Sequence, residues 1–161
     1  MGNLHVEAEQ TTQAAPEIVW ALVSDVMTYP RWGPWREAGY QRPGDTSPRG
    51  QGAVYWLRSS RRYGLSYPVT VEKVLDAEQG RHLAYAVIEG IPVRNYRADI
   101  TLEPAAGGTR IHWAASWDRT LAGRLVHRSL RKLYPQVVAR LAAEAEKEAA
   151  ADARQSAPPA R

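Results

Sequence analysis

The chain has 161 residues, 44% of them hydrophobic, and a net charge of +4, which fits one globular domain with a single core. It contains no cysteine, so a disulfide framework and a thiolate metal site are both excluded. No apolar run typical of a signal peptide or membrane span is present, so we expect a cytoplasmic protein without membrane insertion. The positive charge is mild and spread along the chain, which argues against a nucleic acid partner.

The first part of the sequence predicts a strand and a short helix. Residues 3–12 alternate between apolar and polar side chains, as a half-buried strand does. Pro16 fits the first turn of a helix, where its missing N–H group is not needed. Pro30 and Pro34 prevent continuation, so residues 29–35 are expected to form a tight connection or a second short helix. The buried face of the first helix is expected to carry Val19, Leu22, Val23 and Val26, with Trp20 beside it.

The pattern in the middle of the chain predicts strands that are separated by Gly and Pro residues, with no helical pattern between them. Consecutive strands should therefore pair antiparallel as a meander. The predicted strands span residues 53–59, 65–77, 81–89, 93–103 and 109–118.

After Asp118 the pattern becomes helical, and a long helix is expected to run to about Glu148. Residues 1–148 are thus predicted to form one domain, followed by a disordered tail at 149–161. One face of the helix is apolar, with Val126, Leu130, Leu133, Val137 and Leu141. The opposite face is basic, with Arg124, Arg128, Arg131 and Lys132.

Alternation within the strands predicts which side chains point inward. Strand 53–58 leaves two alternatives open, because Tyr55 and Leu57 compete with Val54 and Trp56. In the other strands the apolar set should face the helix. This set comprises Leu83, Tyr85 and Val87, then Tyr96, Ala98, Ile100 and Leu102, and finally Ile111, Trp113, Ala115 and Trp117.

Three segments carry a family resemblance. These are residues 15–35, APEIVWALVSDVMTYPRWGPW with its Trp32-Gly33-Pro34-Trp35 turn, residues 90–104 and residues 107–113, GGTRIHW. They are similar to the START-related helix-grip superfamily, also called SRPBCC. Within it they resemble the bacterial polyketide cyclase/dehydrase branch, over residues 3–145. The resemblance implies an α+β helix-grip fold, in which a curved antiparallel sheet wraps around a long C-terminal helix and encloses a hydrophobic cavity. A fold of this kind hosts many functions, so the site must decide among them.

Relatives of this branch carry an Arg in the strand equivalent to 54–58 and an acidic residue in the strand that follows. In this chain those places correspond to Tyr55 and to Tyr67-Pro68. The resemblance therefore implies a site in which phenols replace an ion pair and which takes a more neutral, aromatic ligand.

Known cofactor and nucleophile motifs are missing from the sequence: there is no GxGxxG, P-loop, HExxH or GxSxG pattern, and the four histidines are scattered. We therefore expect no cofactor and no metal. A phenol in a cavity can move a proton or hold an enol oxygen, which makes Tyr85 and Tyr96 the catalytic candidates, with ordinary core packing as the alternative. The ligand-binding candidates are Trp32, Trp35, Tyr55, Tyr67, Arg94, Trp113, Trp117, Leu133 and Val137, with Trp32 and Trp35 near the cavity mouth.

Two classes of function remain open. One is a cyclase, aromatase or dehydrase acting on a polyketide-like or other aromatic intermediate, as the resemblance suggests. The other is a non-catalytic binder or carrier of a hydrophobic or aromatic small molecule. For the enzyme, the basic helix face formed by Arg124, Arg128, Arg131 and Lys132 is a candidate docking surface for an acidic acyl carrier protein, with a merely solvated face as the alternative.

Overall fold

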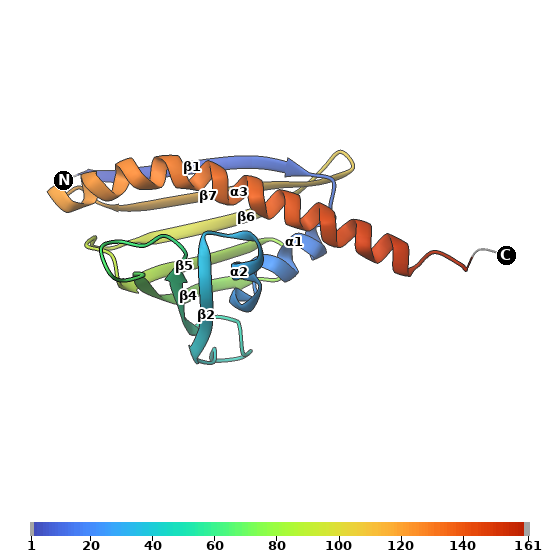
Figure 1. Ribbon diagram of the computed structural model, residues 1–161, viewed down its shortest axis with the longest axis horizontal. Helices are drawn as coiled ribbons and strands as arrows, with labels where there is room; N and C mark the ends of the chain where they lie inside the picture. Colours follow the sequence, from blue (N-terminus) through green and yellow to red (C-terminus); the bar gives the residue numbers. More distant parts are fainter. Residues whose placement is uncertain (1, 160–161) are drawn as a thin grey trace.

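The computed structural model describes residues 2–159, which form one seven-stranded antiparallel sheet and a long C-terminal helix packed along one face of it (Figure 1). The strand order is β1-β7-β6-β5-β4-β3-β2, so the meander predicted from the sequence is confirmed and β1 closes one edge by pairing with β7. The strands are β1 (Asn3–Thr12), β2 (Trp35–Arg42), β3 (Val54–Ser59), β4 (Val69–Glu78), β5 (His82–Glu89), β6 (Arg97–Ala105) and β7 (Gly108–Asp118).

The helical elements begin where the sequence offers a cap or a proline. Helix α1 (Pro16–Val23) has its proline in the first turn, and helix α2 (Tyr29–Trp32) likewise begins with a proline, Pro30, in its first turn. Between them, the short 3-10 helix η1 (Val26–Thr28) is capped by Asp25, whose side chain accepts from the Met27 N–H. The long helix α3 (Leu121–Gln155) starts at Thr120, whose side chain accepts from the Gly123 N–H.

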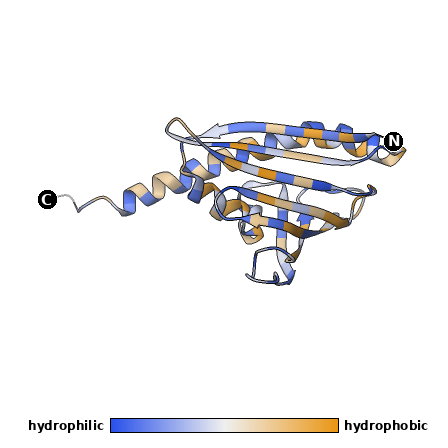
Figure 2. Ribbon diagram, turned by 180° about the vertical axis from the view of Figure 1, so that it is seen from behind, coloured by the Kyte–Doolittle hydropathy of each residue, from blue (hydrophilic) through white to orange (hydrophobic). Residues whose placement is uncertain are grey.

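The core lies between the inner face of the sheet and helix α3, with α1 and α2 covering the remaining part. Alternating hydrophobic and hydrophilic residues along the strands are visible in Figure 2. The predicted inward set at β6 and β7 is buried throughout, as are Leu83 and Tyr85 of β5, which confirms the prediction for these residues, whereas Val87 of β5 is only half-buried. In β3 the structure decides between the two alternatives: Tyr55 and Leu57 are buried, and Val54 and Trp56 are half-buried.

Ion pairs hold α2 against the second half of α3. The Arg31 guanidinium donates to the Glu144 carboxylate at 2.8 Å and also contacts Glu148. Burial on its own raises the pKa of the Glu144 carboxyl, but hydrogen bonds from Arg31 and Lys147 outweigh this effect and leave the pKa below its usual value. The second half of α3 is thus fixed by both packing and charge, whereas Val126, Leu130 and Leu133 of the first half are only half-buried.

Several predicted boundaries are wrong. Strand β2 was not predicted. Strands β4 and β6 begin at Val69 and Arg97, each a few residues after the expected start at residue 65 or 93. Helix α3 continues to Gln155 instead of ending near Glu148, so residues 149–155 of the expected tail are helical; residues 160–161 lie outside the described part. The segment EKEAAADARQ extends the helix because it consists largely of strong helix formers and needs no apolar face. None of the helices in the described chain is long and apolar enough to cross a membrane.

Candidate functional site

Five aromatic side chains meet in the interior between β5, β6, β7 and α3. Tyr85 comes from β5, Tyr96 from the residue directly before β6, Trp113 and Trp117 from β7, and Tyr134 from the helix. Each of the five is buried. Residues on one face of antiparallel neighbours stand side by side, which is why the alternation of these strands brings them together.

Hydrogen bonds connect four of these rings into one polar network. The Trp113 indole N–H donates to the Tyr85 hydroxyl at 3.1 Å, and the Tyr96 and Tyr134 hydroxyls contact each other directly. The Tyr96 ring also stacks on Trp117, with 5.5 Å between the ring centroids. The interior facing the helix is therefore aromatic in shape but carries several hydroxyl groups.

A buried carboxyl group adjoins this network. Glu72 lies in β4 directly opposite Tyr55 of β3, and it is only 7% exposed. The Thr70 hydroxyl donates to the Glu72 carboxyl at 3.3 Å. Burial raises the pKa of Glu72 to about 7, although hydrogen bonds from Tyr55 and Thr70 partly oppose the rise. At neutral pH this carboxyl group is poised between its acid and base forms.

The same burial keeps the phenols neutral. It raises the pKa of Tyr55, Tyr85, Tyr96 and Tyr134 above the usual value, and the nearby negative charge of Glu72 adds to the effect. Neutral phenols are hydrogen-bond donors as well as acceptors. The arrangement thus offers several donors and one group that can accept or release a proton near pH 7.

Glu72 corrects the interpretation of the family pattern made from the sequence. Tyr67 and Pro68 precede β4, and the buried acidic residue of β4, the strand that follows β3, is Glu72. The inference that phenols alone replace the acidic group is therefore wrong. Alternation within β4 contained the signal, because Glu72 shares a face with Val74, which is buried.

The remaining predicted ligand-binding residues lie in different places. Trp32 is buried and Trp35 half-buried, and both pack against Tyr29 with ring centroids 4.8 and 5.0 Å away. Tyr67 is half-buried and lies 4.1 Å below the Arg36 guanidinium, apart from the interior cluster. Val137 is buried and Leu133 half-buried on the inner side of α3.

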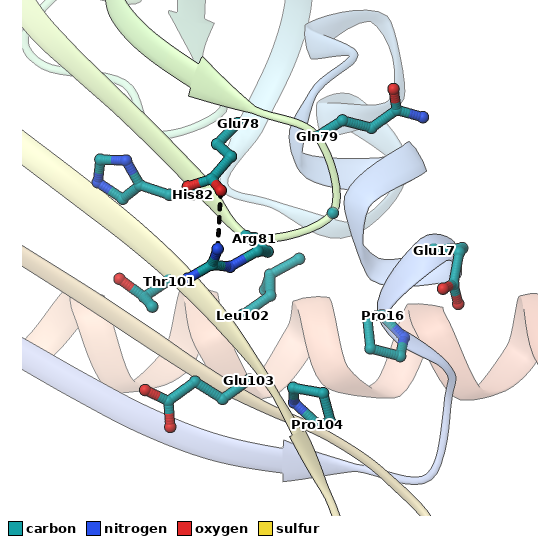
Figure 3. A pocket seen from close by; sticks show the side chains of 11 residues that line it. Pro16, Glu17, Glu78, Gln79, Arg81, His82, Thr101, Leu102, Glu103 and Pro104 are labelled. Atoms are coloured by element: carbon teal, nitrogen blue, oxygen red, sulfur yellow. Dashed lines mark hydrogen bonds and ion pairs between the residues drawn. The ribbon is translucent and has the colours of Figure 1, made fainter.

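Two hollows open on the surface, at opposite ends of the strands. One, of about 530 Å³, lies between the β5–β6 connection and the start of α3, and its lining includes Arg94, which is exposed. The other, of about 660 Å³, lies beside the β4–β5 turn and the first turn of α1; Figure 3 shows its charged lining, with Arg81 paired to Glu78. Trp32 and Trp35 line neither hollow, so the structure does not place them at a mouth.

The interior cluster and the hollows are separate in this structure. Among the predicted site residues only Arg94 borders a hollow, whereas Tyr85, Tyr96, Trp113 and Trp117 pack against one another and against Tyr134. The space between sheet and helix in which the resemblance implies a cavity is occupied by these rings. The histidines are held elsewhere, for example His82 between Asp76 and Asp99 on the outer face, and within residues 2–159 no cluster of His, Asp and Glu has the geometry of a metal site.

Comparison with known proteins agrees with this architecture. The sequence model described as "Polyketide cyclase / dehydrase and lipid transport" matches residues 3–146. A search of curated protein sequences finds no significant match.

Solved structures are similar along nearly their whole length. A START superfamily protein from Mycobacterium smegmatis has a TM-score of 0.73 at 14% identity, over 91% of this chain and 99% of its own. The ZhuI aromatase/cyclase from Streptomyces sp. R1128 has a TM-score of 0.67 at 19% identity, over 92% of this chain and 96% of its own. A protein from Thermus thermophilus has a TM-score of 0.68 at 18% identity, over 92% of this chain and 99% of its own. At these identities the likeness shows the helix-grip fold alone.

Proposed function

Because the chain belongs to the polyketide cyclase/dehydrase and lipid transport family, we propose that it binds an aromatic or apolar small molecule between the sheet and helix α3, and acts on it as a cyclase, aromatase or dehydrase. The observation that supports this proposal is the buried Glu72 carboxyl beside the tyrosine network. A core that serves stability alone gains nothing from a buried carboxyl group, because its burial opposes ionisation. Perturbed groups of this kind are typical of sites that handle protons.

The chemistry that these groups can perform is ring closure or dehydration of a chain of ketones. Glu72, near its pKa at neutral pH, takes a proton from an acidic methylene carbon of the substrate. Tyr85 and Tyr96 donate hydrogen bonds to the carbonyl oxygen on which negative charge develops. The carbanion then attacks a second carbonyl carbon of the held chain, and the alkoxide that forms takes the proton back from Glu72 to become a hydroxyl group. In dehydration Glu72 removes a further proton from the neighbouring carbon, a carbon–carbon double bond forms, and the hydroxide that departs takes this proton and leaves as water.

Binding requires the interior to open, because the tyrosine and tryptophan rings now fill it. We expect Tyr134 to move, since it enters from the helix whereas its partners Tyr85, Tyr96 and Trp113 belong to the sheet. Val126, Leu130 and Leu133 in the first half of α3 are only half-buried, so this half is packed less tightly than the second, although hydrogen bonds from Trp117 to Gly123 and from His127 to His5 also hold it. The hollow beside Arg94 adjoins this part of the helix.

A non-catalytic carrier is the second candidate. It is favoured by the shape of the interior, which is mainly aromatic and has no nucleophile among the five central rings. The same space would hold an apolar ligand without any proton transfer.

Delivery of a substrate by an acyl carrier protein stays a prediction. The candidate docking surface for the carrier protein is the basic face of α3, which is exposed and consists of Arg124, Arg128, Arg131 and Lys132. Replacing Arg128 and Arg131 with Glu should slow turnover of a carrier-bound substrate and spare a free analogue. Equal effects on both substrates would contradict docking at this face.

The experiment that tests the proposal separates binding from turnover. Tryptophan fluorescence is titrated with fatty acids, flavonoids and aromatic polyketides, and at least one should give a saturable change. Native mass spectrometry of protein from its own host should identify a retained ligand of the same class. With a reactive poly-ketone analogue, Glu72→Gln should abolish product formation while keeping affinity. If neither protein forms product but both bind, the carrier function is correct; if nothing in the panel saturates, the proposal fails.

A further inference from the structure

One end of the molecule collects exposed apolar side chains. The antiparallel ladders place three segments together at this end: residues 60–68 between β3 and β4, residues 90–96 between β5 and β6, and residues 119–128 at the start of α3. The N-terminus and the beginning of α3 are seen at this end in Figure 1. We call the three segments together the loop end.

Most of the large hydrophobic residues that remain exposed belong to the loop end or its immediate border. Leu65 is 91% exposed, Leu121 84% and Leu125 67%. Tyr63 and Ile88 are half exposed beside them, and only Met27 of this exposed set lies elsewhere. Single exposed leucines are ordinary, but apolar side chains gathered at one end of the molecule from separate parts of the chain mark an interaction surface.

The charge of the loop end is equally one-sided. Its segments contain no acidic residue and six arginines: Arg61, Arg62, Arg94, Arg119, Arg124 and Arg128. The whole chain has a net charge of only +4, so the rest of the molecule is net negative. Six arginines elsewhere pair with carboxylates, as Arg97 does with Asp99, whereas within the described residues none of the six at the loop end takes part in an ion pair.

The start of the helix carries both kinds of side chain. Leu121 and Leu125 are four residues apart and so lie on one face of α3, pointing away from the buried Gly123. Arg124 and Arg128 each follow one of these leucines by three residues, so basic side chains adjoin the apolar ones along the first turns of the helix. A long arginine side chain can lie along an apolar surface while its charged head stays among lipid headgroups, so this combination is typical of a helix that meets a bilayer surface.

We propose that the loop end docks on the surface of a lipid bilayer that contains anionic lipids. The exposed leucines enter the boundary between headgroups and acyl chains, and the arginines bind the headgroup phosphates. An acidic protein would be attracted by the same arginines, but it gives no reason for exposed leucines both on the β3–β4 connection and at the start of α3. Docking of this kind is peripheral, and it departs from the sequence-based expectation of no membrane insertion because the exposure of these leucines follows only from the folded structure.

The docked orientation places the hollow lined by Pro92, Val93 and Arg94 against the bilayer. An apolar ligand would then pass between lipid and protein without crossing water; this consequence rests on the proposed function. The docking itself concerns only the outer surface and holds whether or not the interior binds a ligand.

The test is flotation of the full chain with vesicles of phosphatidylcholine, with and without phosphatidylglycerol. The protein should float with the anionic vesicles, in a salt-sensitive manner, and much less with the neutral ones. Leu121→Gln with Leu125→Gln should weaken binding at least about tenfold, since both leucines lose their burial in lipid. Arg124→Gln with Arg128→Gln should weaken binding to anionic vesicles and reduce its dependence on salt.

A matched control uses arginines from the other part of the same helix. Arg140 and Arg154 are exposed on α3 and lie away from the loop end, so Arg140→Gln with Arg154→Gln should change vesicle binding less than about twofold. Circular dichroism checks that every variant is folded. Absence of binding to anionic vesicles at low salt, or equal loss in the control and loop-end variants, would overturn the proposal. So would binding of an acidic acyl carrier protein that needs the same residues while vesicles do not bind.

Discussion

Glu72 makes the stability of the protein depend on pH in an unusual direction. Its pKa of about 7 in the folded protein exceeds the ordinary value of 4.5, so the folded state holds the proton more tightly than the unfolded state. The resulting stabilisation is fully present below the unfolded pKa and is lost as the pH rises through 7. The difference corresponds to about 3 kcal/mol of unfolding free energy.

Glu72→Gln removes this dependence, because glutamine keeps the shape of the protonated acid and does not ionise. The variant should therefore be more stable than the native protein by up to about 3 kcal/mol at about pH 8, and nearly equal to it at about pH 4 to 5. Urea unfolding at the two pH values measures the difference.

Glu144 provides a control of opposite sign. Its carboxylate is paired with Arg31 at 2.8 Å and with Lys147 at 3.3 Å, and its pKa lies below the usual value. Glu144→Gln should therefore lower the unfolding free energy at about pH 8. Should Glu72→Gln also lose stability at that pH, Glu72 would be a stabilised carboxylate and unsuited to accept and return protons near pH 7.

Tyr96 distinguishes a functional hydroxyl group from a structural one. Tyr96→Phe keeps the ring stacked on Trp117 but removes the hydroxyl group that contacts Tyr134. For a ligand found in the fluorescence panel, we expect about tenfold weaker binding, the effect of one lost hydrogen bond. The measurement is a fluorescence titration of both proteins with that ligand.

Tyr29→Phe is the matched control variant. The Tyr29 hydroxyl, at the start of α2, donates to the carbonyl oxygen of Val23 at the end of α1, at 2.8 Å. Tyr29→Phe should lower stability by about 1 kcal/mol and leave ligand affinity unchanged. If Tyr96→Phe behaves in the same way, with a lower melting temperature and unaltered affinity, Tyr96 is a core residue and the carrier function gains support.

At the scale of the elements, the connection that begins at Gly90 depends on the absence of a side chain. Gly90 follows β5 with φ of +101°, and a Cβ atom there would lie 2.1 Å from the Val69 carbonyl oxygen at the start of β4. Gly90→Ala should therefore destabilise the protein by more than about 2 kcal/mol, because both the backbone angle and the close approach oppose it. Thermal unfolding followed by circular dichroism measures the loss.

Gly80 separates these two causes. It also has a positive φ, +75°, but a Cβ atom there would meet nothing within 4 Å. Gly80→Ala should cost about 1 kcal/mol, from the backbone angle alone. Equal losses in the two variants would mean that strands β4 and β5 readily separate at this end.

The sequence predicted strands where alternation was regular and failed where it was not. In β6 and β7 every second residue is apolar, so the inner positions of Tyr96 and Trp113 followed directly. Strand β2, WREAGYQR, is an edge strand with exposed or half-buried residues throughout and therefore has no such pattern. In β4 the inner face holds Thr70 and Glu72 before Val74, while Val69 and Val71 lie on the other face, so hydrophobicity alone does not identify the inner side.

The candidate site was predictable only in part, for a related reason. Tyr85, Tyr96, Trp113 and Trp117 share apolar faces of adjacent strands, and the structure brings them together. Glu72 belongs beside them because β3 pairs with β4 in one particular register, and Tyr134 because of the rotation of α3. The periodicity of a single segment determines neither the register between two strands nor the rotation of a helix about its axis.

For the molecule as a whole, the core ends well before the chain does. The last fully buried residue of α3 is Ala145, and the residues beyond Ala151 are exposed as far as residue 159. A chain ending at Ala151 should unfold in a single transition with a melting temperature within about 2 °C of the full chain. A chain ending at Val138, which lacks the buried Leu141, Ala142 and Ala145, should not fold.

Calorimetry of the two truncated chains gives the measurement. A single transition in the longer chain is what one domain over residues 1–148 requires. Two separate transitions, or a fall of more than about 5 °C on removing the end of the helix, would show that residues 152–161 contribute to the folded domain.

The pairing of β1 with β7 has a consequence for synthesis of the protein. Asn3 lies opposite Asp118 and Thr12 opposite Thr109. The strand of this sheet that is synthesised first therefore pairs with the strand that is synthesised last. Strands β2 to β6 pair with neighbours in sequence and can associate while translation continues, but β1 has no partner until almost the whole sheet has been made. Throughout that interval Leu4 and Val6 and one free strand edge stay open to other nascent chains. The charged residues Glu7 and Glu9 and the polar His5, which stand between the apolar positions of β1, limit that exposure.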